Sequence, residues 1–169
     1  MIRIFLIGYM ASGKTSTGKL LATQLGLQFV DMDAHIVEKM GKTIPEIFSE
    51  LGEDEFRRLE REALHEMAQM NNAIISTGGG APCFFDNIDY MNAHGLTIYL
   101  KYTPEQLTAR LSVHPHKRPL VAAQKPEDLL EFVRNGLAAR ELFYSKATLK
   151  LTGTNEEIVE HACNYLASL

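Results

Sequence analysis

Residues near the start of the chain have the types and spacing of a phosphate-binding loop. Residues 8–15 read GYMASGKT and match the pattern G-x-x-x-x-G-K-[ST]. Gly8 and Gly13 leave room for close approach of a phosphate to the backbone N–H groups. Lys14 can reach the β- and γ-phosphates, and Thr15 offers a hydroxyl to Mg²⁺. The motif predicts ATP or GTP as ligand; the alternative is an ordinary glycine-rich turn with an exposed lysine.

A second group of candidate residues follows the next apolar run. Asp31 and Asp33 flank Met32, and strand alternation would point both carboxylates in the same direction. One could lie near Mg²⁺ while the other meets an acceptor hydroxyl, as phosphoryl transfer requires. The alternative is a helix cap, because Asp33 precedes a helical pattern.

Two further segments could hold an anionic acceptor. Arg57 and Glu60 are three residues apart on a predicted helix, so the carboxylate can orient the guanidinium as a fork for an anion. Residues 78–80 are three successive glycines, whose backbone N–H groups could bond phosphate or substrate oxygens. A surface arginine and a flexible turn are the alternatives.

The segment 112–125 fits no helix or strand pattern. Arg118 lies within it and could stabilise charge on the transferred group when the segment closes, and Arg140 lies late in the next helix. We expect His114 and His116 to be polar loop residues rather than metal ligands, because no other Cys or His clusters with them.

The elements that must position these residues alternate between strand and helix. The loop at residues 8–15 is preceded by the apolar run 2–7 and followed by leucines at helical spacing that end at Gly26. Capping residues mark helix starts at Thr43 and Thr103, and Gly41 marks a helix end. Five apolar runs, 2–7, 27–30, 73–76, 96–100 and 147–151, predict an α/β fold with a five-stranded parallel sheet covered by helices on both faces.

Bulk properties limit the class of protein. The 169 residues suit one domain, and a net charge of −4 argues against general nucleic-acid binding. The first apolar run is too short for a signal peptide or a membrane span. Two separated cysteines, Cys83 and Cys163, are expected to be reduced thiols. We therefore expect a cytoplasmic protein, a monomer, that binds a small anion and neither nucleic acid nor membrane.

In this order and at these spacings, the motifs resemble those of the shikimate kinase family. They are GYMASGKT, Asp31-x-Asp33, FRRLE from Phe56, TGGGA from Thr77, RPL from Arg118, and Arg140. The resemblance covers essentially the whole chain and is more specific than the phosphate loop alone. It implies a three-layer P-loop kinase fold over residues 1–169, with a mobile lid at about 112–125 and a shikimate-binding helical segment at about 34–61. It also implies transfer of the ATP γ-phosphate to the 3-hydroxyl of shikimate, giving shikimate 3-phosphate and ADP in aromatic amino-acid biosynthesis.

The resemblance further implies roles for matching positions. Asp33, Lys14 and Arg118 would be catalytic, and Thr15 and Asp31 would serve Mg²⁺. ATP would contact Gly8, Ala11, Ser12, Gly13, Lys14, Thr15, Ser16, Arg110, Arg118 and Asn155. Shikimate would contact Asp33, Arg57, Gly78, Gly79, Gly80, Arg140, Phe48 and Phe56.

The sequence departs from the family pattern in a few places. Ala11 stands where glycine is usual, Val121 stands where leucine is common, and residues 152–155 lack an arginine that some relatives carry. Two alternatives stay open: a related small-molecule kinase acting on gluconate or a nucleoside monophosphate, and a nucleotide-binding switch without an acceptor.

Overall fold

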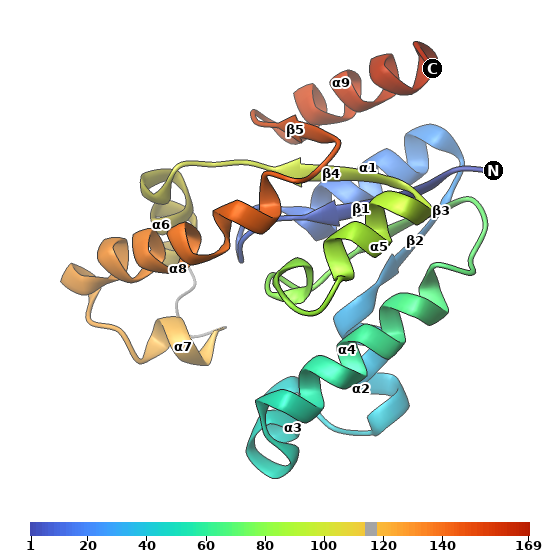
Figure 1. Ribbon diagram of the computed structural model, residues 1–169. Helices are drawn as coiled ribbons and strands as arrows, with labels where there is room; N and C mark the ends of the chain where they lie inside the picture. Colours follow the sequence, from blue (N-terminus) through green and yellow to red (C-terminus); the bar gives the residue numbers. More distant parts are fainter. Residues whose placement is uncertain (114–117) are drawn as a thin grey trace.

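The computed structural model describes residues 1–113 and 118–169 and has a central parallel sheet with helices on both sides (Figure 1). The prediction of five parallel strands is confirmed, and the strand order is β2-β3-β1-β4-β5. The strands are β1 (Arg3–Ile7), β2 (Gln28–Asp31), β3 (Ala73–Ser76), β4 (Leu96–Leu100) and β5 (Leu149–Leu151).

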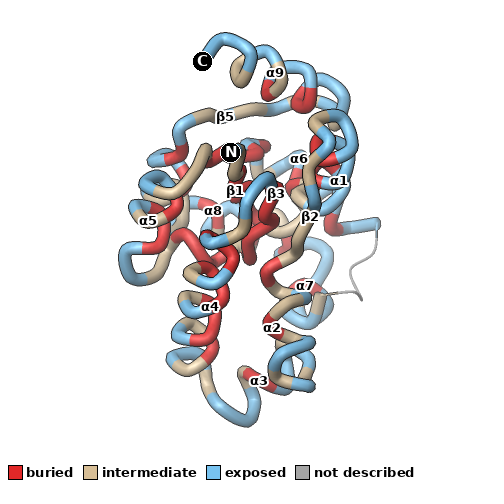
Figure 2. Tube along the Cα trace, turned by 90° about the vertical axis from the view of Figure 1, so that its right-hand side faces the viewer, coloured by how far each residue is buried: buried red, intermediate tan, exposed pale blue. Residues whose placement is uncertain are grey.

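Burial explains the composition of the strands. The middle strand β1 lies between β3 and β4, and its residues Ile4 to Ile7 have no exposed surface. A strand covered on both faces needs apolar residues at successive positions rather than an alternating pattern. The edge strand β2 is less buried. Figure 2 shows the same gradient, with buried segments concentrated at the centre and exposed ones on the outer helices.

Strand order brings three sequence motifs to one edge of the sheet. The phosphate loop follows β1, the glycine run follows β3 and the Asp31–Asp33 pair lies at the end of β2. These strands are neighbours in the order β2-β3-β1. Since the strands are parallel, their carboxyl ends meet at the edge where open α/β sheets bind ligands.

The helices fall into three groups. In Figure 1, α1 lies behind the sheet and α5 in front of it, while α2, α3 and α4 form an arm below. The arm begins at the carboxyl end of β2. The helices are α1 (Lys14–Leu25), α2 (Met32–Met40), α3 (Ile44–Leu51), α4 (Glu53–Met67), α5 (Asn87–His94), α6 (Pro104–Val113), α7 (Pro119–Ala122), α8 (Leu129–Tyr144) and α9 (Asn155–Ala167), with 3₁₀ turns at Ala81–Cys83 and Pro126–Asp128.

The predicted helix ends are confirmed. Thr43 and Glu46 form a reciprocal capping box at α3, and Thr103 and Gln106 exchange the equivalent bonds at α6. Each such cap stabilises a helix by about 1 kcal/mol. Gly26, like Gly41, ends its helix in the left-handed conformation that favours glycine.

Two local predictions are wrong. The segment 112–125 is not wholly irregular, because α6 extends to Val113 and residues 119–122 form the short helix α7. The second concerns Asp33, which is not on a strand: β2 ends at Asp31, so strand alternation does not orient the pair. The expectations for His114 and His116 lie outside the described residues.

No helix within the described ranges is long and apolar enough to cross a membrane.

Candidate active site

The loop between β1 and α1 has the backbone geometry of a phosphate cradle. Gly8 and Gly13 have φ values of 154° and 88°, which favour glycine. A Cβ on Gly8 would lie 2.8 Å from Ser12 Oγ and 3.0 Å from the Leu100 carbonyl oxygen, so a side chain has no room there. The loop is followed directly by α1, whose N-terminal N–H groups are oriented for an anion.

Lys14 lies across the loop. Its Nζ donates to the carbonyl oxygens of Gly8 at 2.6 Å and Tyr9 at 3.1 Å. Burial lowers the pKa of Lys14 to about 8, Asp33 opposes this shift, and Arg118 and Arg140 add to it. An ammonium group under this desolvation gains from the arrival of an anionic phosphate.

Two further side chains expected to contact ATP, Arg110 and Asn155, bond to the loop and to α1. The Arg110 guanidinium lies 4.0 Å from the Tyr102 ring centroid, and its Nη1 donates to the Ala11 carbonyl oxygen at 3.1 Å. Asn155, at the start of α9, accepts a hydrogen bond from Thr17 at 2.9 Å. Ser16 is exposed in the first turn of α1. Arg110 and Asn155 therefore lie beside the loop and the first turn of α1, and their contact with ATP stays a prediction.

The two aspartates occupy different positions at the start of α2. Asp31 is the N-cap of α2, and its Oδ1 accepts from the Ala34 N–H at 3.1 Å. Asp33 is in the first turn of α2, so the cap predicted as the alternative belongs to Asp31 instead. Both side chains still line one cavity with Lys14. A helix start, rather than strand alternation, brings them together.

Asp33 lines this cavity and has an unsatisfied carboxylate oxygen beside Gly78. Its Oδ1 is buried and has no hydrogen-bond partner among the described residues. Burial raises the pKa of Asp33, and Asp31 raises it further, while Lys14 and Arg57 oppose the shift. A carboxylate in this state is a strong acceptor for a hydroxyl proton.

Each of the three glycines faces a different functional side chain. A Cβ on Gly78 would lie 2.9 Å from both Asp33 Oδ1 and Glu60 Oε2. On Gly79 it would lie 3.2 Å from an Arg140 nitrogen, and on Gly80 it would lie 2.7 Å from an Arg57 nitrogen. The glycine run therefore brings two carboxylates and two guanidinium groups to one stretch of backbone, and any larger residue would displace one of them.

The predicted pairing of Arg57 with Glu60 is confirmed. Arg57 Nη1 donates to Glu60 Oε1 at 2.9 Å, and the two side chains are 11% and 1% exposed. Burial raises the pKa of Glu60 to about 7, against the opposing effect of Arg57. The Phe48 and Phe56 rings pack 4.6 Å apart between centroids, and Arg57 lies near both.

The sequence interpretation missed two aromatic residues near this group. Phe84 lies closer to the Arg57 guanidinium than Phe48 or Phe56, at 4.1 Å to its ring centroid. Tyr144, one turn after Arg140 on α8, donates its hydroxyl to the Gly79 carbonyl oxygen at 2.5 Å. The only sequence signal for Phe84 was its position just after the glycine run, and Tyr144 gave none beyond helical spacing from Arg140.

A cavity of about 600 Å³ extends from the phosphate loop to Asp33, Gly78 and Gly79. The other residues expected to contact shikimate do not line it: Arg57, Gly80, Arg140, Phe48 and Phe56. Arg118 lines it from the start of α7. No cluster of three or more His, Cys, Asp or Glu side chains within residues 1–113 and 118–169 could hold a metal alone. Asp31 and Thr15 line the cavity together, which suits Mg²⁺ because that ion uses few protein ligands and takes the rest from phosphates and water.

Fold and site together define a P-loop kinase that acts on a small molecule. The family model for shikimate kinase matches residues 10–169. The chain belongs to the shikimate kinase family and is an ATP-dependent enzyme of that class.

Similar proteins support this assignment over most of the chain. The shikimate kinase of Phocaeicola vulgatus is 50% identical over 147 residues, covering 87% of this chain and 84% of the relative. That of Parabacteroides distasonis is 48% identical over 149 residues, covering 88% and 86%. A crystal structure of the shikimate kinase from Bacteroides thetaiotaomicron has a TM-score of 0.94 and 40% identity, covering 98% of each chain.

Two further structures bear on the acceptor. The shikimate kinase from Acinetobacter baumannii in complex with shikimate has a TM-score of 0.87 and 31% identity, covering 99% of this chain and 94% of that one. A gluconokinase from Sinorhizobium meliloti has a TM-score of 0.58 and only 17% identity, so its likeness concerns the fold alone.

Proposed function

We propose that this enzyme transfers the γ-phosphoryl group of ATP to the 3-hydroxyl of shikimate, with Asp33 as the residue that binds that hydroxyl. The observation that carries this assignment is the buried, unpartnered Asp33 Oδ1 beside Gly78, in the same cavity as the phosphate loop. A hydroxyl donating to this oxygen satisfies it and stands next to the donor phosphate.

The carboxylate of shikimate binds to Arg57 and Arg140. Both guanidinium groups approach neighbouring glycines, and Glu60 fixes Arg57 by an ion pair with almost no exposed surface. A guanidinium group held in one orientation binds a planar carboxylate with two parallel hydrogen bonds and loses little conformational entropy on binding. Phe48 and Phe56 supply the apolar wall against which the substrate ring packs.

During transfer, the acceptor oxygen forms a bond to the γ-phosphorus as the bond from that phosphorus to the bridging oxygen of ADP breaks. The hydroxyl proton passes to Asp33, whose raised pKa suits it to accept the proton. Lys14, Arg118 and the loop N–H groups stabilise the negative charge on the phosphoryl oxygens. Thr15 and Asp31 hold Mg²⁺, which neutralises phosphate charge when it is bound with the nucleotide.

Other parts of the proposal concern the chain as a whole. Segment 112–125, of which residues 114–117 lie outside the described residues, acts as a lid that carries Arg118 at the cavity. Segment 34–61 binds shikimate from the arm. We also propose that the protein acts as a monomer. Two free cysteines support a cytoplasmic location.

Measuring ADP release with single acceptors tests the function. We expect turnover with shikimate and no more than background with gluconate or a nucleoside monophosphate. Turnover only with gluconate would contradict the acceptor assignment. ATP hydrolysis that shikimate does not change would instead favour the nucleotide switch.

Replacing Arg57 with alanine is expected to raise the KM for shikimate by about 10²-fold, because a charge-assisted pair to the carboxylate contributes about 1.5–3 kcal/mol. The KM for ATP should change less than about threefold, within the effect expected of a remote surface change. Steady-state kinetics with each substrate varied in turn measures both constants.

Arg58→Ala is the matched control for this variant. Arg58 is the next residue on α4, but it is exposed and pairs only with Glu55 and Glu62 on its own helix, among the described residues. Its removal should leave both KM values unchanged. If Arg57→Ala raised the two KM values equally, Arg57 would maintain the structure of the site rather than bind the shikimate carboxylate.

Replacing Phe84 with leucine is expected to raise the KM for shikimate about three- to tenfold, since stacking of a cation on an aromatic ring contributes about 0.5–2 kcal/mol. Phe84→Tyr keeps the ring face and should restore the wild-type KM, while turnover at saturation changes little in either variant. A loss of kcat without a change in KM would show that Phe84 does not act by positioning Arg57.

A further inference from the structure

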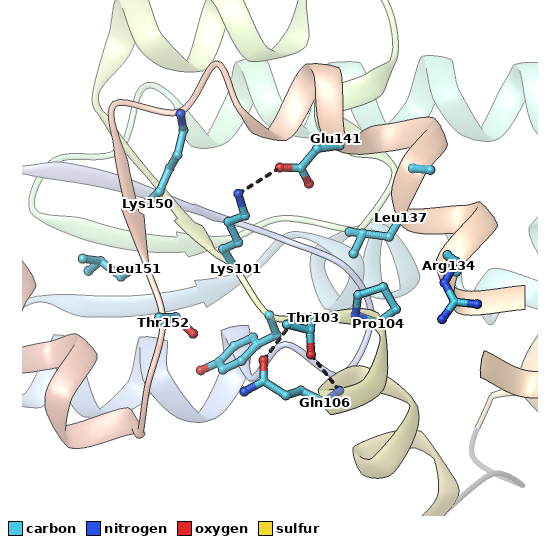
Figure 3. A pocket seen from close by; sticks show the side chains of 12 residues that line it. Lys101, Thr103, Pro104, Gln106, Arg134, Leu137, Glu141, Lys150, Leu151 and Thr152 are labelled. Atoms are coloured by element: carbon cyan, nitrogen blue, oxygen red, sulfur yellow. Dashed lines mark hydrogen bonds and ion pairs between the residues drawn. The ribbon is translucent and has the colours of Figure 1, made fainter. Parts of the chain in front are cut away.

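A second cavity lies away from the phosphate loop, between the carboxyl ends of β4 and β5, the start of α6, and α8 (Figure 3). Its volume is about 600 Å³, and it shares no lining residue with the cavity of the proposed active site. We propose that this second cavity binds a small aromatic carboxylate, and that its occupancy weakens shikimate binding through α8. The second part rests on the proposed function.

The charges around the cavity favour an anion. Lys101, Lys150 and Arg134 line it, and Glu141 is the carboxylate among the lining residues. Arg134 already pairs with Glu105 and Glu131, so the two lysines are the cations that a ligand would meet. Lys101 Nζ lies 3.5 Å from Glu141 Oε1, whereas Lys150 makes no ion pair within the described part of the chain. In Figure 3, both lysines and Glu141 lie at one end of the cavity. A monoanion placed there meets two ammonium groups.

The remaining lining favours a flat apolar body. Pro104, Leu137, Ala138 and Leu151 are apolar residues of the lining, and Pro104 lies at the opposite end from the lysines in the view of Figure 3. The volume falls in the range of small-molecule sites, which are largely apolar and have a few polar groups to fix orientation. An aryl ring joined to a carboxylate by a short linker matches both ends of the cavity.

A continuous set of contacts links this cavity to the acceptor site. Glu141 Oε2 accepts a hydrogen bond from Tyr99 at 2.8 Å, and the Tyr99 ring packs 5.0 Å from the Tyr144 ring. Tyr144 in turn donates to the Gly79 carbonyl oxygen. Burial raises the pKa of Tyr99, so its hydroxyl remains a donor to Glu141.

The direction of the effect follows from competition for Lys101. A carboxylate ligand that binds Lys101 leaves Glu141 with Tyr99 as its remaining partner. Repulsion between the ligand charge and the Glu141 carboxylate then displaces Glu141 and the part of α8 that carries it. Arg140 is the next residue on that helix and lies against Gly79 in the acceptor site. Displacement of α8 therefore misplaces a guanidinium that shikimate needs, and the KM for shikimate rises.

The probe is 3-phenylpropanoate, and its uncharged amide is the control. Binding of each compound is measured by titrating it into the protein and recording NMR chemical shifts. We expect saturable shifts at residues of β4, β5 and α8, a dissociation constant of about 0.1–1 mM as for a small weak ligand, and at least tenfold weaker binding of the amide. In kinetic assays, the carboxylate should raise the KM for shikimate about threefold or more, to a plateau set by a finite coupling energy.

Variants at exposed lining positions locate the probe. Ala138→Phe fills the cavity from α8, and Lys150→Gln removes a cation that lines it; neither residue belongs to the proposed catalytic or binding machinery. Ala138→Phe should abolish binding and inhibition while keeping wild-type turnover, and Lys150→Gln should weaken binding about fivefold. Wild-type turnover with shikimate in the absence of the probe tests the proposed function separately.

Two results would overturn the binding site itself. One is the absence of saturable shifts up to the solubility of the probe. The other is binding that persists in Ala138→Phe and that shikimate displaces competitively without a plateau, because the carboxylate would then occupy Arg57 and Arg140. Binding at the second cavity with no change in KM would refute the coupling through α8.

Discussion

The Asp33→Asn variant is expected to lose about 10²–10⁴-fold in turnover with shikimate, the range for removal of a general base. Asparagine keeps the size of the side chain and can still contact a hydroxyl, but it cannot take the proton. ATP affinity should stay near the wild-type value, because Asp33 faces Gly78 rather than the loop between β1 and α1. Single-turnover kinetics and nucleotide titration measure the two effects independently.

Stability provides the control for a folding defect. The pKa of Asp33 is raised in the folded protein, so its ionised form destabilises the fold. The favourable contribution is present below the unfolded pKa of aspartate and is lost as pH rises through the folded value. The asparagine side chain carries no charge, so the thermal midpoint of Asp33→Asn at pH 7 should equal or exceed that of the wild type.

Glu38→Gln, an exposed change on the same helix, should alter neither turnover nor stability. Turnover of Asp33→Asn within about threefold of wild type, far less than the loss expected for a general base, would exclude Asp33 from proton transfer. Near-normal turnover would instead indicate a loose transition state, in which little of the hydroxyl proton has been abstracted.

In the Lys14→Met variant, kcat/KM for ATP is expected to fall about 10²–10³-fold, because removing one preorganised group that stabilises transition-state charge has an effect of this size. Lys14 is the cation of the loop, and methionine keeps most of its length without the charge. Lys19→Met is the matched control: Lys19 also lines the cavity, but it is exposed on α1 and lies 5.9 Å from the Phe29 ring centroid. The kcat/KM for ATP of Lys19→Met should fall only a few-fold.

The pH dependence separates the charge of Lys14 from its shape. Its pKa is about 8 without nucleotide, so the wild-type affinity for ATP should fall as pH rises above 8, while Lys14→Met shows no such fall. The unfolded chain holds this proton up to about pH 10.4. Wild-type stability therefore gains relative to Lys14→Met as pH rises from 8 to that value. A flat wild-type affinity profile between about pH 7 and 9, either side of this value, would contradict the lowered pKa.

Local patterns in the sequence were sufficient for the sheet, the phosphate loop and the caps. Each depends on residues close in the chain, such as Thr43 and Glu46, whose bonds follow from spacing alone. The pairing of Arg57 with Glu60 is equally local. Such elements follow from short-range geometry, and the structure confirms them.

Contacts that depend on tertiary packing could not be predicted in this way. Phe84 reaches Arg57, and Tyr144 reaches Gly79, from elements far apart in sequence. The orientation of Asp33 was predicted for the wrong reason. Strand alternation requires the strand to continue through Asp33, but β2 ends at Asp31 and α2 begins at Met32. To predict which distant residues meet in the fold, one must know the strand order. No short sequence pattern contains that order.

Ala11 has a further consequence, for the order of folding events. Its φ of 67° lies in the left-handed region, which costs a residue with a Cβ about 1–2 kcal/mol, and Arg110 holds its carbonyl oxygen from α6, nearly a hundred positions away. An unfolded chain seldom visits this conformation, and α6 must be docked before Arg110 can hold it. Nucleotide binding should therefore arise only after α6 has docked, and a truncated chain that lacks α6 should bind ATP poorly even if β1 and α1 have formed.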